Sequence, residues 1–257
     1  WEEYAAVEEA EDVPDAIIDD MLDSEGFREV MRHYHRDLLW ANVSTIQYIQ
    51  FYWDLTRSNV VEGQDTHQVY YMRRRSSYYR GGPDDLENMA IPCGGWEATF
   101  DGNGRPEQVC DEETGRCLEG WVWVEPYWAP GTEIKVCAFD AQDAEYGDGG
   151  VACGSQGSRR ETTCGCGPNL AYCDAGFGVN VQATVGVALS EQMLEVIDWV
   201  IREDRPYHEI LTTRRSFVNG PLVHYFRHQV ELAAGVTMTP APLEGDFLPD
   251  MAWNDPS

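Results

Sequence analysis

Positive charge is scarce in this sequence. Across 257 residues, 45 acidic side chains stand against 18 lysines and arginines, which gives a formal net charge of −27 at pH 7. Lys135 is the only lysine. A polyanion repels nucleic acid and anionic lipid surfaces, so we expect neither as a partner. Long apolar runs are also missing, and no stretch approaches the roughly 18 residues of a membrane-spanning helix.

Several chemical signatures are absent as well. The sequence contains no Cys-x-x-Cys, which argues against a zinc knuckle, an iron–sulfur cluster or a covalently attached haem in this chain. Gly-x-Ser-x-Gly, His-Glu-x-x-His and a phosphate-binding glycine loop ending in lysine are missing too. The sequence therefore leaves the catalytic residues unknown.

Cysteine is present, but only in one region. All eight cysteines lie within residues 93–173, in sequence rich in Gly, Asp and Pro. An even number at this density is typical of a module stabilised by disulfides outside the cytoplasm. We predict four disulfides and an extracytoplasmic location, in the periplasm, at the cell surface or secreted. The Cys110/Cys117 pair flanks a hairpin-like tip and is the one pairing the sequence favours, while the others stay open. The cysteines are Cys93, Cys110, Cys117, Cys137, Cys153, Cys164, Cys166 and Cys173.

Five segments follow one another along the chain. Residues 1–13 form an acidic arm, and residues 236–257 form a proline-rich extended tail or linker. Residues 14–91 and 188–235 show helical periodicity, whereas residues 92–187 show short alternating runs typical of strands. We therefore predict an α+β fold, in which a helical domain built from both chain ends carries an inserted disulfide-rich, strand-containing module.

The first helical part contains three recognisable stretches. A short helix should end near Asp23, and Ser24 is placed to cap the next one. Residues 45–55 are apolar and aromatic and predict a buried helix, whereas residues 66–80 fit strand or helix equally. The helix after Ser24 should carry an apolar stripe made of Phe27, Val30, Met31, Tyr34 and Leu38.

The second helical part is predicted to begin after a strand over 179–189. Ser190 is the expected cap of a helix that ends near Arg205. A short helix over 207–213 should follow. Asn219 then opens another helix, which reaches to about residue 232.

Two histidines share a face of this last helix. His224 and His228 are four residues apart, so their side chains point the same way. They are the candidate ligands for a transition metal, or for a haem carried by a partner chain. The alternative is that both are solvated on the polar face of the helix.

Acidic side chains offer a second candidate cation site. A loop beginning at Asp101 resembles part of a calcium-binding loop, but Pro106 occupies the position where that loop requires glycine. A looser cluster makes calcium the candidate cofactor, although acids also gather by chance in so acidic a chain. The calcium candidates are Asp140, Asp143, Glu145 and Asp148.

Three stretches carry a family resemblance. They are Arg-Pro-Tyr-His-Glu-Ile-Leu-Thr-Thr at 205–213 with Phe-Val-Asn-Gly-Pro-Leu at 217–222, Cys-Gly-Cys-Gly-Pro-Asn-Leu-Ala-Tyr-Cys at 164–173, and Trp-Ala-Pro-Gly-Thr-Glu-Ile-Lys-Val-Cys at 128–137. Together they resemble a planctomycete and myxobacterial family of large secreted proteins of unknown function, which carry a cytochrome-c-like haem segment elsewhere in the chain. The resemblance implies a longer precursor, with haem only on a partner or on another segment.

Two functions from different classes fit these observations. The first is an extracytoplasmic structural or interaction subunit of a secreted or cell-envelope assembly, associated with other protein subunits and with a haem-bearing electron-transfer partner. The alternative is an extracellular, hydrolase-like enzyme whose site is assembled from scattered acids and histidines. The tail favours the first, because its apolar side chains should dock on this chain's helical domain or on a neighbouring subunit. Those side chains are Phe247, Leu248, Met251 and Trp253.

Overall fold

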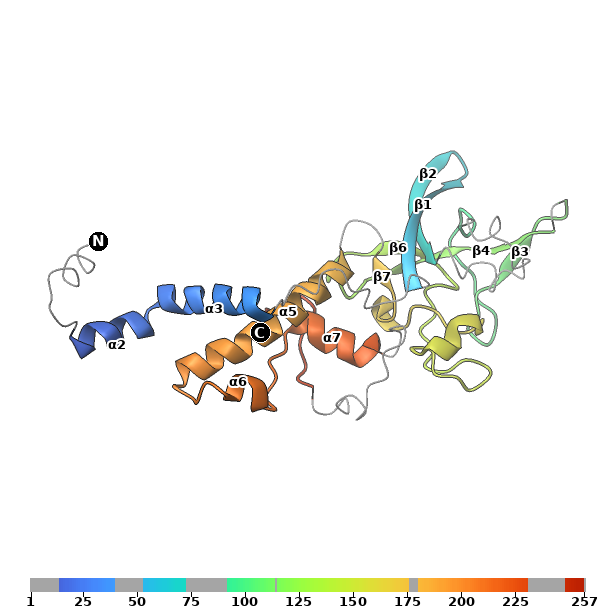
Figure 1. Cartoon of the computed structure of the whole chain (residues 1–257). Coiled ribbons are helices and arrows are strands. Elements are labelled where there is room, and N and C mark those ends of the chain that lie inside the picture. Colours follow the sequence, from blue (N-terminus) through green and yellow to red (C-terminus); the bar gives the residue numbers. More distant parts are fainter. Residues whose placement is uncertain are drawn as a thin grey trace. The chain divides into compact units, whose positions relative to one another are not determined.

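The computed structural model divides the chain into two compact units (Figure 1). Unit 1 comprises Trp1–Thr45 and Gly186–Val218, and unit 2 comprises Ile46–Val185 and Asn219–Ser257. Helices and strands are both present, so the α+β class is confirmed. A single helical domain built from both chain ends stays a prediction. The residues described are 14–39, 53–72, 92–113, 115–175, 180–230 and 248–256.

Unit 1 is helical. The two N-terminal helices form as the sequence predicts, and Ser24 Oγ accepts a hydrogen bond from the backbone N–H of Phe27 at 3.1 Å, which caps the second of them. The elements of this unit are α2 (Asp15–Asp23), α3 (Glu25–Leu39), most of α5 (Val181–Arg202) and α6 (Glu209–Thr212).

The start of α5 corrects the sequence analysis. Residues 181–189 are helical rather than a strand, and Ser190 lies inside the helix instead of capping it. The cap is Asn180, whose side-chain oxygen accepts from the N–H of Ala183 at 3.0 Å. Val181 and Val185 are fully buried and four residues apart, which is the spacing of one helix face. The β-branched residues here thus suggested a strand, although their burial follows the helical period.

Unit 2 is built on a five-stranded mixed sheet, with strand order β5-β6-β2-β1-β7. β1 pairs antiparallel with β2, and β5 pairs antiparallel with β6. The β2/β6 and β1/β7 pairs are parallel. The strands are β1 (Asp54–Glu62), β2 (Asp65–Met72), β5 (Trp121–Val124), β6 (Ile134–Cys137) and β7 (Asp174–Ala175), with a separate hairpin of β3 (Gln108–Cys110) and β4 (Cys117–Glu119).

The β1–β2 hairpin is a second correction. The sequence analysis placed residues 54–72 in the helical part, and they form two strands of the sheet instead (Figure 1). Gly63, in the left-handed region at φ 61°, allows the tight turn between them. The buried helix predicted over 45–55 is wrong for its last two residues, which begin β1, and residues 45–52 lie outside the described part of the chain.

All eight cysteines pair, so the prediction of four disulfides is confirmed, including the local Cys110–Cys117 bridge. The pattern fits a protein of an oxidising compartment outside the cytoplasm. Among the described helices, none combines the length and the apolar character needed to cross a membrane. The other bridges are Cys93–Cys137, Cys153–Cys164 and Cys166–Cys173, and two short 3₁₀ helices lie at Gln156–Arg160 and Pro168–Leu170.

The last helix of unit 2, α7 (Gly220–His228), holds the end of the chain. Its cap is Asn219, as predicted, whose side chain accepts from the N–H of Leu222 at 3.2 Å. Gly220 donates its N–H to the Asp255 carbonyl at 3.0 Å, and a Cβ there would lie 1.9 Å from the Ala252 oxygen. The predicted docking of the tail is therefore confirmed for residues 248–256, on a helix of the same chain. The start of the tail, with Phe247, lies outside the described residues.

Candidate functional site

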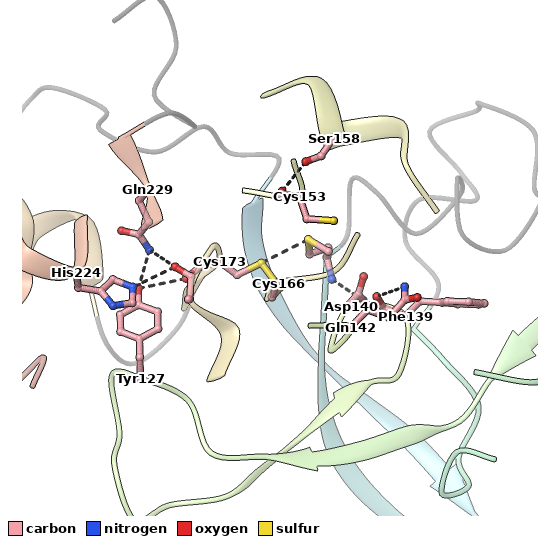
Figure 2. The surroundings of a disulfide bond; sticks show 12 residues. Tyr127, Phe139, Asp140, Gln142, Cys153, Ser158, Cys166, Cys173, His224 and Gln229 are labelled. Atoms are coloured by element: carbon pink, nitrogen blue, oxygen red, sulfur yellow. Dashed lines mark hydrogen bonds between the residues drawn. A yellow bond between two sulfur atoms is a disulfide. The ribbon is translucent and has the colours of Figure 1, made fainter. Parts of the chain in front are cut away.

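A polar and aromatic cluster surrounds Tyr127 beside the Cys166–Cys173 disulfide (Figure 2). The Tyr127 hydroxyl donates to the Cys173 carbonyl at 3.2 Å and accepts from Gln229 Nε2 at 3.0 Å. Burial raises the pKa of the Tyr127 phenol well above its ordinary value. The phenol therefore stays protonated and holds α7 against the stapled loop.

His224 packs flat on Tyr127, with the ring centroids 3.6 Å apart. Its Nε2 lies 3.0 Å from the Ala171 carbonyl oxygen, which can only accept, so Nε2 carries the proton and Nδ1 the lone pair. Burial, followed by the neighbouring His228, lowers the pKa of His224 to about 3. His224 is thus a neutral, hydrogen-bonded packing residue at physiological pH.

The two predicted histidine ligands do lie together, with ring centroids 4.9 Å apart. They are half-buried among aromatic rings rather than solvated: Trp253 meets His224 edge-on at 5.6 Å, and the Tyr172 ring lies 6.3 Å from that of His228. A metal bound at Nε2 of His224 would have to displace its bond to Ala171. Ligation by His224 and His228 stays a prediction.

The four calcium candidates take separate roles. Asp140 is fully buried and accepts from the Met72 N–H at 2.9 Å, which ties the 140–142 turn to β2. Asp148 pairs with Arg105 at 2.7 Å, whereas Asp143 and Glu145 are exposed. Within the described residues, one group of three possible ligands gathers its atoms within 4.8 Å, and it is Cys93, Glu119 and Cys137. Because those two sulfurs form a disulfide, they offer no thiolate to a metal, and calcium binding by the four acidic candidates stays a prediction.

Two carboxyl groups face each other across the β1/β7 pair. Asp54 and Asp174 are direct partners in the parallel register, and Asp174 is only 6% exposed. Burial, and then the charge of Asp54, raises the pKa of Asp174 to about 7. The pair therefore retains a proton near neutral pH.

In unit 1, α3 turns a polar face toward α5. Arg32 forms ion pairs with Glu191, Glu195 and Asp198, the Glu195 contact measuring 2.9 Å. His35 on α3 is buried, with 1% of its surface exposed. Its Nδ1 donates to the Met31 carbonyl, so its Nε2 accepts a hydrogen bond from the Tyr207 hydroxyl at 2.5 Å. The side of α3 withdrawn from solvent thus carries guanidinium–carboxylate pairs and a buried histidine, together with the half-buried Phe27, Met31 and Leu39.

The predicted apolar stripe of α3 is exposed only in part, since Phe27 and Met31 are half-buried. Val30 is 64% exposed, Tyr34 55% and Leu38 57%. Because they are four residues apart, the three side chains lie on the same side of the helix. The neighbouring α2 has no buried residue. Its Ile17 is half-buried, and its other three large apolar side chains are exposed. They are Ile18, Met21 and Leu22. We call these six exposed side chains on α2 and α3 the outer apolar face.

The chain was compared with protein-family models, with curated proteins and with solved structures. None of these comparisons found a match. The resemblance to the planctomycete and myxobacterial family therefore stays a prediction, and the chemistry of the chain has to be argued from its own residues.

Sequence reasoning missed two features of these sites. The stripe over residues 27–38 was recognised, but its period shows only that one face is apolar, and not which face packs on the protein. The available signal was the row of Arg28, Arg32 and Arg36, which are four residues apart and so lie on one face of the helix. The acids at 191, 195 and 198 have a similar helical spacing. The Asp54/Asp174 pair left no signal, because the two residues meet only through sheet topology.

Proposed function

We propose that this chain is an extracytoplasmic interaction subunit, which joins a secreted or cell-envelope assembly through the outer apolar face of α2 and α3. The helical domain from both chain ends, part of the same proposal, is the body that presents this face. The supporting observation is that α3 pairs with α5 through Arg32 while Val30, Tyr34 and Leu38 stay exposed on its surface. Several exposed apolar side chains on one helix are unfavourable in water and commonly mark a protein interface.

The charge around this face indicates the kind of partner. Exposed acids flank the apolar side chains on both helices, among them Asp19, Asp23, Glu29 and Asp37. A second copy of this chain would bring like charges together, and an anionic bilayer would repel them. The favoured partner is a protein surface with apolar side chains at its centre and arginine or lysine at its rim.

The test is the size of the particle in which the chain is recovered. The tagged chain is expressed in the cells that produce it, extracted gently, and its mass measured by size exclusion with light scattering. The native chain should be recovered well above its own 29.1 kDa. The variant Val30→Gln/Tyr34→Gln/Leu38→Gln, which keeps a good helix former at each exposed position, should be recovered as the single chain.

A matched control keeps the test specific. Val61 and Val109 are 63% and 60% exposed on strands of unit 2, so Val61→Gln/Val109→Gln removes exposed apolar side chains elsewhere. The control should remain in the large particle. Recovery of the α3 variant at the native size would refute the proposed interface.

A haem-bearing electron-transfer protein is the partner that the family resemblance implies. Its presence is tested by the visible absorbance of the recovered particle, which should show a haem band that is lost with the α3 variant. A colourless particle of the expected mass would leave the interface in place and remove haem from the account.

A further inference from the structure

A cavity of about 650 Å³ opens in unit 2 beside the stapled loops. Two loops line it: the turn that follows Phe100, and residues 141–148 together with Thr163. Val122 on β5 and Ala138 just after β6 belong to the same lining. The cavity is thus part of the sheet-bearing unit and lies apart from the outer apolar face.

Two aromatic rings line this cavity and remain exposed. Phe100 is 50% exposed and Tyr146 is 65% exposed. Each is held at its backbone by an isolated bridge, Phe100 to Pro106 and Tyr146 to Ala152. A ring with a fixed backbone and an uncovered face offers a flat apolar surface to a ligand.

Hydrogen-bonding side chains accompany the two rings. They supply both donors and acceptors, and most of them are planar amide, carboxylate or guanidinium groups. The Gln142 amide nitrogen already donates to the Phe139 and Thr162 carbonyls, at 2.9 and 3.0 Å, so its oxygen remains as an acceptor. The polar lining residues are Asn103, Arg105, Gln142, Asp143, Asp148 and Thr163.

The charge of the lining excludes some ligand classes. Arg105 is paired with Asp148, and Asp143 adds a further negative charge, so the acids of the lining outnumber its cations. A phosphate, sulfate or carboxylate ligand would be repelled here. A neutral ligand with many hydroxyl groups would not be.

The walls are held in place before any ligand arrives. The Cys153–Cys164 bridge fastens the loop after Tyr146, and the Asp148 N–H donates to Thr163 Oγ1 at 3.1 Å. The Arg105–Asp148 ion pair then links the two loops. Because the site is formed before binding, little conformational entropy is lost when a ligand binds. This suits a hydroxyl-rich ligand whose individual interactions are weak.

From these observations we infer that the cavity binds a neutral oligosaccharide. The apolar C–H face of a sugar ring stacks on Phe100 and Tyr146, while its hydroxyls, which both donate and accept, pair with the amide, carboxylate and guanidinium groups beside them. This inference goes beyond the proposed interaction function and does not depend on it, because none of its residues lies on the outer apolar face.

The test is binding of the whole disulfide-bonded chain to immobilised hexasaccharides of glucose and of N-acetylglucosamine, with oligogalacturonate as the anionic comparison. We expect at least one neutral series to bind with a dissociation constant of about 1 mM or tighter. Phe100→Ala and Tyr146→Ala should each weaken binding by roughly tenfold or more. Tyr207→Ala, at a 55% exposed tyrosine of unit 1 that belongs neither to the cavity nor to the outer apolar face, should leave it unchanged.

Three results would overturn the inference. They are no binding to any neutral series, binding that neither aromatic variant weakens, and preference for the anionic oligosaccharide. Near-ultraviolet circular dichroism and the absence of reactive thiols show that each variant keeps its fold. Because the particle size of Phe100→Ala and Tyr146→Ala should stay native, failure here is distinguishable from failure of the proposed interface.

Discussion

Replacing Asp174 by asparagine should make the protein less sensitive to rising pH. Asp174 is 6% exposed, and burial together with Asp54 raises its pKa from 3.8 to about 7. Between about pH 4 and pH 7 this group is ionised in the unfolded chain but protonated in the folded one. The folded state therefore binds more protons than the unfolded state, and the free energy of unfolding falls as the pH rises through this window.

The size of the effect follows from the shift. About three pH units at 1.36 kcal/mol each give roughly 4 kcal/mol of stability that the native protein has near pH 4 and lacks above pH 7. Asparagine has nearly the same shape as the protonated acid and does not titrate. The stability of Asp174→Asn, minus that of the native chain, should therefore rise by up to about this amount across the window.

The assay is urea unfolding at several pH values with the disulfides intact. Only the difference between the two proteins is informative, because the lowered pKa of His224 destabilises the native chain in acid and opposes the Asp174 effect. Asp54→Asn removes the second cause of the shift and should reduce the pH slope in part. If Asp174→Asn and the native chain give parallel curves from pH 4 to pH 7, the carboxyl pair is not coupled as described.

Three further predictions concern what holds unit 2 together. Replacing both cysteines of Cys93–Cys137 by serine should lower the free energy of unfolding by about 4 kcal/mol, and the same change at Cys110–Cys117 by about 2.5 kcal/mol. The difference arises because the first bridge joins residues 44 apart in the sequence and the second joins residues 7 apart. The urea midpoints of the two double variants test this order. Asn219→Ala should cost about 1 kcal/mol in the same assay, and Asn219→Ser much less. Trp253→Ala should lower the free energy of unfolding by about 2 kcal/mol and speed proteolysis of residues 248–256. Equal proteolysis rates in the variant and the native chain would show that this segment is not docked.

Local signals in the sequence were enough to predict much of the structure. The cysteine count gave four disulfides, and Ser24 and Asn219 marked true helix starts, because capping and crosslinking depend on residues close in sequence or in number. The strand assigned over 179–189 failed because β-branched residues can also follow a helical period when the helix is buried.

Features that depend on tertiary contacts could not be predicted in this way. The β1–β2 hairpin joins the sheet through a parallel pairing of Tyr70 with Val136, far along the chain. The cavity between Phe100 and Tyr146 likewise depends on how two loops far apart in the sequence come together, and the pairing of most cysteines was left open by their number alone.

Hydrogen exchange of the recovered particle tests the central claim most directly. The amides of α3, residues 25–39, are compared between the isolated chain and the particle in which the cells assemble it. If α2 and α3 form the interface, exchange should slow over residues 15–39 by about tenfold or more in the particle, while β3 and β4 keep their rates. Unchanged exchange over residues 15–39, with protection gained only in unit 2, would contradict the account.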